Sequence, residues 1–418
     1  MRSEAFNFHQ LFQCPLDKAF IRQLDVDVKT TRVMDDAVDK IRNILSPALR
    51  QLALNAGVPS QYATPRFRMQ GSAVYKTQNQ PAHIPPQQVD VDFGVYIAAA
   101  FMSSASNDHA GKKYPAHTLA KTYFETVDTL LKKLCNRESW KCAEGKKQKD
   151  TCCRIDLSPV GVAAHIDVPL YAAPNEQFEK ALTLDEQIAK SIQFAEARGN
   201  VAPKIDREGW DELTVVVMAT RSGEWSESDV QIVIQHFRAA SDCLAHPFVL
   251  RKVWRYIKAW RDYTWPDGSA PSSVLLMEAV VQIFDVNLKA SQELLGSGRE
   301  DRILHHVFTH LGNALTKDIW VNWGTTPENL NTANAQLRTE WTAAANACHK
   351  SLDQALFDAT LQNKQVINLV RLRFGQRIPD DVTLVTFLAV TAPMAHAATP
   401  PKQQQDPQAR IHRTTGAQ

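Results

Sequence analysis

The apolar residues change their spacing about halfway along the chain, and this change limits the possible folds more than any other feature. The first half mixes helical spacing with strand-like alternation; the helical segments are 29–56 and 117–135, and the strand-like segments are 64–69, 89–97, 153–157, 163–172 and 213–219. Helical spacing then covers 226–243, 246–263, 271–293, 300–315, 333–361, 362–373 and 380–396. We therefore expect an α+β protein in which a mixed sheet with a long N-terminal helix packs on a C-terminal helical bundle, with a ligand cleft between the lobes.

The length of 418 residues is enough for two or three domains. We predict a mixed lobe at 1–245, a helical lobe at 246–397 and a flexible tail at 398–418. The tail prediction rests on composition, because that segment has almost no large apolar residues and is rich in proline and glutamine.

Composition excludes several classes of protein. Lys and Arg number 47 against 45 Asp and Glu, so the net charge of +2 does not favour a broad nucleic-acid coat or a membrane-surface binder. The chain starts without the apolar stretch of a signal peptide and has no run of about 18 apolar residues, so we expect a soluble cytoplasmic protein. Seven cysteines form no even framework, and Cys142, Cys152 and Cys153 lack zinc-ribbon spacing, which favours free thiols over a metal site.

Two acids inside an apolar strand are the strongest local signal of function. Asp90 and Asp92 are two positions apart, so both side chains project from the same face of the strand. Two carboxylates that close together repel each other unless a cation such as Mg²⁺ lies between them. Taken alone, a pair of this kind favours a solvent-facing position on an exposed sheet surface over a metal site.

A third acid strengthens the metal interpretation. Asp167 lies between Ile166 and Val168 in another apolar strand, where a carboxylate is costly without a partner. Three strand acids are what two-metal phosphoryl transfer requires.

A short polar turn precedes the two acids. Gly71 allows the backbone to approach a phosphate closely, and the Ser72 hydroxyl lies at the start of a probable short helix, where free N–H groups are available. A turn that simply ends the strand would have the same sequence. The order of the turn, the acid pair and the third acid favours phosphate binding.

These motifs resemble the DNA-polymerase-β-type nucleotidyltransferases, and specifically the dinucleotide-cyclase branch of the bacterial cGAS/DncV-like (CD-NTase) family. The matching segments are Gln70-Gly71-Ser72 with Tyr75, Thr77 and Asn79, Asp90-Val91-Asp92-Phe93-Gly94 and His165-Ile166-Asp167-Val168-Pro169. Further matches are Phe6-Asn7-Phe8-His9-Gln10, Lys258-Ala259-Trp260-Arg261-Asp262 and Pro271-Ser272-Ser273. The resemblance covers roughly residues 5 to 290, weakens through 380 and does not extend to the tail.

The resemblance implies roles for the three acids and for the turn. Asp90 and Asp92 would bind two Mg²⁺ ions, or Mn²⁺ in their place, and Asp167 would complete the metal site that activates the attacking ribose hydroxyl. Ser72, with Gln70, Gly71 and Tyr75 around it, would hold the β- and γ-phosphates.

The cations and later serines have implied roles too. Lys258 would neutralise the triphosphate, Ser272 or Ser273 would donate hydroxyls to it, and Arg154 would contact the acceptor nucleotide. Each has a plainer interpretation: a solvated helix face for Lys258, a helix cap for Ser272 and an ion pair for Arg154. The tryptophans of the helical half, Trp254, Trp260 and Trp265, are expected in the core rather than in base stacking.

The implied function is a cyclic dinucleotide synthase. It would join ATP and GTP into a product such as 3′,3′-cyclic GMP-AMP, release pyrophosphate, and supply a second messenger for anti-phage (CBASS) defence. Alternatives are a template-independent transferase acting on RNA, a small molecule or a protein, and a silent nucleotide-binding regulator. Phe93 departs from relatives that carry another acid there, which leaves base preference open.

The resemblance also bears on partners. Strong activation by DNA is not expected, because only the loop around 141–149 is rich in lysine. No membrane partner is expected. The tail could be recognised by an ancillary ubiquitin-transfer-like protein, or it could have no partner.

Overall fold

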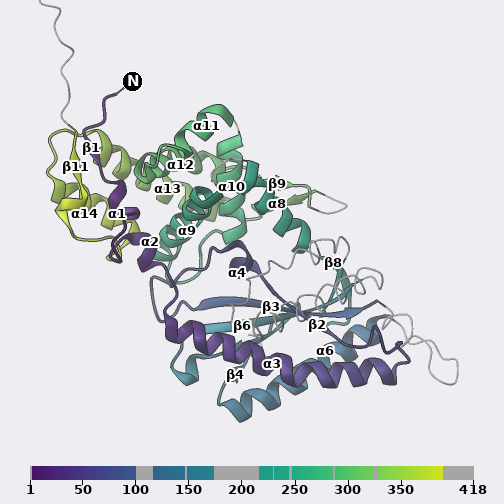
Figure 1. The fold of residues 1–418 in the computed structure, drawn as a ribbon. Helices are drawn as coiled ribbons and strands as arrows, with labels where there is room; N and C mark the ends of the chain where they lie inside the picture. The colour runs from purple at the N-terminus through teal and green to yellow at the C-terminus, as the bar shows by residue number, and fades with distance from the viewer. Residues whose placement is uncertain are drawn as a thin grey trace, which may run out of the picture.

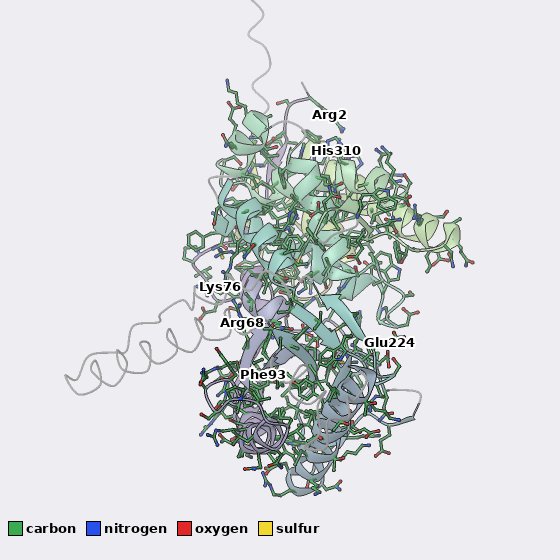
Figure 2. All side chains as sticks on the ribbon, turned by 90° about the vertical axis from the view of Figure 1, so that its right-hand side faces the viewer. Arg2, Arg68, Lys76, Phe93, Glu224 and His310 are labelled. Atoms are coloured by element: carbon green, nitrogen blue, oxygen red, sulfur yellow. A yellow bond between two sulfur atoms is a disulfide. The ribbon has the colours of Figure 1, made fainter. Side chains whose placement is uncertain are left out.

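The structure, a computed structural model, describes residues 2–99, 116–145, 148–173, 216–228, 230–243, 247–285, 288–323 and 327–388. Two lobes are visible in Figure 1, a sheet lobe and a helical lobe. Figure 2 shows Phe93 in the sheet lobe and Arg2 and His310 at the opposite end of the molecule. The predicted tail 398–418, on which the hypothesis of an ancillary partner depends, lies outside the described residues.

The sheet lobe contains a seven-stranded mixed sheet in the order β2-β3-β6-β5-β4, with β7 on β6 and β8 on β7. The strands are β2 (Arg66–Gln70), β3 (Val89–Ala98), β4 (Lys141–Cys142), β5 (Cys152–Asp156), β6 (Ala164–Ala173), β7 (Val216–Ala219) and β8 (Trp225–Ser228). Within the described part of the sheet, β3 and β6 pair in parallel and the other pairs are antiparallel. The predicted hairpin between β5 and β6 is present, with the 3₁₀ turn η2 (Ser158–Val160) at its tip.

Two long helices cover one face of this sheet: α3 (Val28–Asn55) and α6 (Ala116–Glu138). The α3 helix starts at Asp27, whose carboxylate accepts a 2.8 Å hydrogen bond from the Thr30 amide, and its apolar stripe is buried against the sheet. Figure 1 shows both helices on the side of the sheet turned away from the helical lobe. The opposite side therefore carries the short helix α4 (Gly71–Tyr75) toward the helical lobe.

The helical lobe is built from seven longer helices among the described residues. They are α8 (Val230–Cys243), α9 (Pro247–Thr264), α10 (Ser273–Asp285), α11 (Leu288–Leu295), α12 (Glu300–Leu315), α13 (Ala335–Phe357) and α14 (Asn363–Phe374). A small hairpin of β9 (Trp320–Val321) and β10 (Glu328–Asn329) connects α12 to α13. The predicted α+β architecture is confirmed.

The start of the chain packs in the helical lobe. Residues of β1 (Phe6–Asn7), α1 (His9–Phe12) and α2 (Phe20–Gln23) belong to the same apolar core as α9, α12 and α14. The Phe12 ring lies 5.3 Å from the ring of Tyr256 and 5.4 Å from that of Phe374, centroid to centroid. The predicted boundaries 1–245 and 246–397 follow the order of the chain, whereas the packing gives the helical lobe its first segment from the N-terminus.

Three predicted helical segments differ from the structure. The start of 226–243 is strand β8, because Gly223 at φ +99° closes a hairpin with β7. The described part of 380–396 is a 3₁₀ turn, η4 (Val382–Leu384), followed by β11 (Thr386–Phe387), which pairs with β1. The segment 271–293 is two helices, α10 and α11. Backbone pairing with distant segments overrode local spacing in the first two cases.

The cysteine prediction is partly wrong. Cys135 at the end of α6 and Cys142 on β4 form a disulfide, whereas Cys14, Cys152, Cys153 and Cys348 are buried free thiols. Among the described residues, no helix is both long and apolar enough to cross a membrane.

Candidate active site

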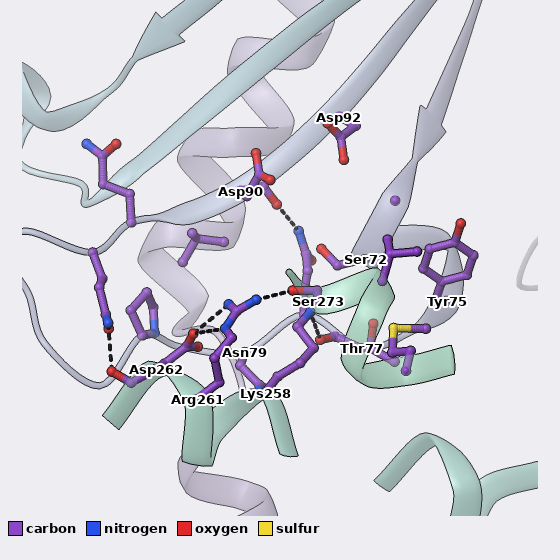
Figure 3. A pocket seen from close by; sticks show the side chains of 18 residues that line it. Ser72, Tyr75, Thr77, Asn79, Asp90, Asp92, Lys258, Arg261, Asp262 and Ser273 are labelled. Atoms are coloured by element: carbon purple, nitrogen blue, oxygen red, sulfur yellow. Dashed lines mark hydrogen bonds and ion pairs between the residues drawn. The ribbon is translucent and has the colours of Figure 1, made fainter. Parts of the chain in front are cut away.

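Strand pairing brings the three predicted acids together. In the parallel register of β3 and β6, Asp92 lies opposite Asp167, and Asp90 lies opposite His165. The neighbouring strand β2 ends where Gln70 pairs with Asp92, so the turn into α4 starts beside the same carboxylate. Figure 3 shows Asp90 and Asp92 projecting from β3 toward the labelled side chains of the helical lobe.

Asp92 is half-buried and lies close to two other acids. Burial, and then the charges of Asp90 and Asp167, raise the pKa of Asp92 to about 6. A Cβ atom on Gly71 would lie 2.1 Å from the Asp92 Oδ2 atom, so only glycine allows the turn to pass this close. The turn at Gly71 therefore lies directly against the Asp92 carboxylate, and a bound cation would stabilise the charge of that carboxylate.

Asp167 has the opposite electrostatic environment. Arg154 donates to it in bidentate fashion, with Nε 2.6 Å from Oδ1 and Nη2 2.7 Å from Oδ2, and the Lys149 ammonium lies 2.7 Å from Oδ2. Burial alone would raise the pKa of Asp167, but the hydrogen bonds from Arg154 and Lys149 outweigh burial and lower it. Asp167 is therefore ionised and already neutralised within the chain.

The third acid, Asp90, is exposed to the cleft. Its Oδ1 atom lies 2.9 Å from Nε2 of His165, and Nδ1 of the same imidazole lies 3.1 Å from the Gln88 amide oxygen. The contact with Gln88 orients the imidazole toward Asp90.

The first of two cavities lies between the acids and the helical lobe, with a volume of about 330 Å³. Its lining residues include Gly71, Ser72, Tyr75, Thr77, Asn79, Asp90, Asp92, Lys258, Arg261, Asp262 and Ser273. The Thr77 hydroxyl is buried and has no hydrogen-bond partner among the described residues. An unsatisfied donor in a cavity wall favours a polar ligand there.

Lys258 carries the buried positive charge of this cavity. Its ammonium donates a 2.7 Å hydrogen bond to the Thr77 carbonyl, and no carboxylate of the described chain lies within ion-pair distance. Burial, with help from the nearby Arg261 charge, lowers the pKa of Lys258 to about 8. Arg261 itself is held by Asp262 and by the Ser273 hydroxyl, as Figure 3 shows. A bound anion would restore the full charge of Lys258.

The second cavity opens on the other side of Asp92 and has a volume of about 750 Å³. Its lining residues include Lys149, Cys152, Asp167, Tyr171, Met218, Ser272, Trp323, Glu328 and Asn329. Gly71, Tyr75, Asp92 and Val274 line both cavities. Two ligands could therefore meet at Asp92. The Trp323 indole N–H in this wall is buried without a partner among the described residues.

The other predicted site residues have structural partners in the chain. The Gln70 amide is buried and bonded to the hydroxyls of Tyr96 and Tyr171, which leaves Ser72 as the cleft-facing side chain of that turn. Ser272 accepts a 3.1 Å hydrogen bond from the Leu275 amide, as its plainer interpretation as a helix cap predicted. Arg154 likewise forms the ion pair of its plainer interpretation, with Asp167 as its partner.

The tryptophans follow their structural prediction. Trp254 and Trp260 are buried in the core of the helical lobe, and Trp265 packs against that core.

Several residues of the cleft are not predicted from the sequence. His165 and Lys149 were visible within a motif and a lysine-rich loop, but only the β3–β6 register and the path of the loop place them on Asp90 and Asp167. Trp323 and Asn329 come from the β9–β10 hairpin, more than 150 residues from the acids in sequence. No local pattern identifies residues brought together over such distances.

The acids fit divalent metal ions. Oxygen atoms of Asp90 and Asp167 and a ring nitrogen of His165 lie within 4.8 Å of one another. Burial, and then the charges of Asp90 and Asp167, raise the pKa of the neighbouring Asp92. Mg²⁺ prefers carboxylate oxygens together with substrate phosphates. Asp90, Asp92 and Asp167 are the residues that would hold such ions.

Comparison with known proteins gives two family matches in order along the chain. Residues 65–171 match the model described as cyclic GMP-AMP synthase DncV-like, nucleotidyltransferase domain, and residues 248–387 match cyclic GMP-AMP synthase, C-terminal domain. A cyclic GMP-AMP synthase of Escherichia coli is 36% identical over 242 residues, which are 56% of this chain and 50% of that protein. A second, of Vibrio cholerae, is 36% identical over 228 residues, 53% of this chain and 48% of that protein.

Solved structures have the same fold. The Vibrio cholerae DncV cyclic AMP-GMP synthase in complex with the linear intermediate 5′ pppA(3′,5′)pG matches with a TM-score of 0.67 at 22% identity, over 92% of this chain and 100% of that one. The same synthase in complex with nonhydrolyzable GTP gives 0.66 at 21% identity, over 92% of this chain and 99% of that one.

The sequence matches cover about half the length of the curated relatives. The two domain models nevertheless occur in the order of the sheet lobe and the helical lobe, and the fold agrees over nearly the whole described chain. This chain belongs to the family of DncV-like nucleotidyltransferases.

Proposed function

We propose that the protein is a cyclic dinucleotide synthase that joins ATP and GTP into 3′,3′-cyclic GMP-AMP and releases two pyrophosphates. The observation that supports this most strongly is the pair of cavities that share Asp92 as a wall. A site that forms two phosphodiester bonds must hold two nucleotides at one set of acids. The relatives' names and the linear dinucleotide in one solved structure point to the same products.

The first cavity would take the triphosphate of the nucleotide that is attacked. Lys258 supplies a buried ammonium, Ser72 and Ser273 supply hydroxyls, and the Thr77 hydroxyl has no partner among the residues that the structure describes. Removing a cation from water makes its interaction with an anion stronger. Negative charge on the ligand would in turn favour the protonated form of Lys258.

Asp90, Asp92 and Asp167 would orient the reacting groups through the ions they hold. Two bound Mg²⁺ would neutralise the phosphates and lower the pKa of the attacking ribose hydroxyl. Arg154 and Lys149 keep the pKa of Asp167 low, so that this carboxylate remains ionised.

The second cavity would hold the acceptor nucleotide. Lys149 lines this cavity on the Asp167 side, and Arg154 is bonded to the same carboxylate. The β9–β10 hairpin adds Trp323, whose indole N–H is buried without a partner among the described residues. After the first bond forms, the linear intermediate would have to bind again with its ends exchanged, and the larger volume of this cavity leaves room for a second base.

The test is product formation from defined nucleotides. Purified protein with Mg²⁺ is given ATP, GTP, CTP and UTP singly and in pairs, and phosphatase-resistant products are identified by mass spectrometry. A cyclic product that requires ATP and GTP together supports the proposal. A linear, acceptor-linked product would favour the template-independent transferase instead, and no product under conditions where relatives turn over would count against both.

The product would act as a second messenger in anti-phage defence. The proposed ancillary ubiquitin-transfer-like partner concerns the tail at 398–418. A pull-down that is unchanged by deletion of residues 400–418 would remove that idea without affecting the enzymatic proposal.

A further inference from the structure

Three potential metal ligands converge on the helical lobe, far from the acids of the cleft. His305 projects from α12, and His349 and Asp353 project from α13, one helical turn apart. One ligand atom from each lies within 4.8 Å of the other two. The two helices pack along their length, so the three side chains are presented by a rigid pair of elements.

The spacing matches a tetrahedral ion. Nε2 of His305 and Oδ1 of Asp353 are 3.3 Å apart. Two ligands at the usual zinc distances of 2.0–2.2 Å and the tetrahedral angle are separated by about 3.3–3.6 Å. The same distance is at the long end for a hydrogen bond between nitrogen and oxygen.

A simple pair of His305 and Asp353 would leave His349 unexplained. Its imidazole packs on the His305 ring at 5.2 Å between centroids, and it makes no hydrogen bond to another described residue. The three side chains together form a set of potential metal ligands. In this set the half-buried imidazole of His349 has no hydrogen-bond partner among the described residues.

A neighbouring arginine orients the carboxylate of this cluster. Arg2 binds Oδ2 of Asp353 at 2.9 Å and leaves Oδ1 toward the imidazoles. Hydrogen bonds of this kind to a ligating carboxylate orient many metal sites.

We propose that His305, His349 and Asp353 bind one Zn²⁺ or a similar divalent transition-metal ion, with water in the fourth position. Two imidazoles and one carboxylate suit zinc and disfavour Mg²⁺, which prefers oxygen ligands. The ion would tie α12 to α13 and, through Arg2, to the first residues of the chain. Figure 2 places Arg2 and His310 of α12 at the end of the molecule remote from Phe93 of β3, so this ion would be separate from those of the cleft.

The experiment is a Co²⁺ titration of the full chain in excess Mg²⁺, which occupies the acids of the cleft. Tetrahedral Co²⁺ has intense visible absorption, and Zn²⁺ should displace it. We expect one ion per chain, and a loss of affinity of at least tenfold in both His349→Gln and Asp353→Asn. Zinc at a hundredfold excess over the wild-type Kd should raise the melting temperature of the wild type by roughly 3 °C and that of each variant by at most about half as much.

The matched control is His310→Gln, an exposed histidine on the same helix that is outside the cluster. Its Co²⁺ spectrum and affinity should equal those of the wild type. Melting curves in EDTA verify that every variant is folded before its affinity is read. Absence of tetrahedral Co²⁺ absorption in the folded wild type, or equal affinity in the wild type and in both cluster variants, would overturn the proposal.

Discussion

The two cavities that meet at Asp92 hold their positive charge in different ways. In the first, Lys258 is buried and donates to the Thr77 carbonyl, and it has no carboxylate partner at ion-pair distance in the described chain. In the second, the lining residue Lys149 is paired with Asp167, which also binds Arg154, and the Lys149 side chain is 47% exposed. The first cavity thus contains a lysine, Lys258, that a bound anion could neutralise. The second contains an acid, Asp167, that residues of the chain already neutralise.

The two cavities thus differ in how their charged side chains are arranged before a ligand binds. An uncompensated buried charge costs free energy until its ligand arrives, so it favours binding at the expense of stability. A compensated carboxylate contributes stability but must exchange some of its contacts before a metal can share it. We therefore expect mutations on the two sides to separate activity from stability.

Loss of the Asp90 or the Asp167 carboxylate should produce the largest effect on activity. Asp90→Asn and Asp167→Asn should each reduce the rate of cyclic product formation by about 10³-fold or more, because each removes charge from the site where metal and triphosphate meet. Mass spectrometry of the product gives the rate, and Asp39→Asn, an exposed acid on α3, is the control. Retained activity in Asp90→Asn would remove that residue from the metal site.

Removal of the buried cation should come next. Lys258→Met is expected to lower kcat/KM for the nucleotide by about 100-fold, because a buried charge-assisted contact to the triphosphate is lost. Its fold should be at least as stable as the wild type, since an uncompensated buried charge disappears. Lys289→Met on α11 is exposed and should have no effect. If Lys258→Met and Lys289→Met behave alike, Lys258 is not a ligand of the substrate.

Stability should distinguish the two inactive acid variants. Asp167→Asn deprives Arg154 and Lys149 of their partner and should lower the free energy of unfolding by about 2 kcal/mol. Asp90 is half-exposed, and its replacement relieves repulsion with Asp92, so Asp90→Asn should change stability by less than about 0.5 kcal/mol. Urea denaturation measures both values, and equal losses would contradict the contrast between the two sides.

The smallest expected effect is the pH dependence of nucleotide binding. The pKa of Lys258 is lowered from 10.5 to about 8, so the free protein loses this charge as the pH rises through 8. Because the protonated form binds the triphosphate, kcat/KM should fall about tenfold between pH 7 and pH 9. The profile of Lys258→Met should be flat over that range. A fall of equal size in the variant would assign the titration to another group.

Prediction from sequence succeeded where a feature depends on neighbours along the chain. Helical spacing located α3 to within a residue of its observed start, and alternation located β3 with both acids on one face. The order of the turn at Gly71, the acid pair and Asp167 also led to the family that the comparisons show.

Prediction failed where the partner is distant. The pairing of β1 with β11 joins residues about 380 positions apart and turns an expected helix into a strand. Lys149 and Arg154 could not be assigned to Asp167, nor Gln70 to Tyr96 and Tyr171, because these contacts depend on how strands align across the sheet and, for Lys149, on the path of a loop.

The sequence by itself determined which residues could do the chemistry, since side-chain type and local periodicity place three acids on the faces of two strands. The tertiary structure alone decided their electrostatic state. Electrostatic interactions depend on separation and burial, so the same residue type, aspartate, has a pKa near 6 at Asp92 and a lowered pKa at Asp167. Only the folded chain sets these distances.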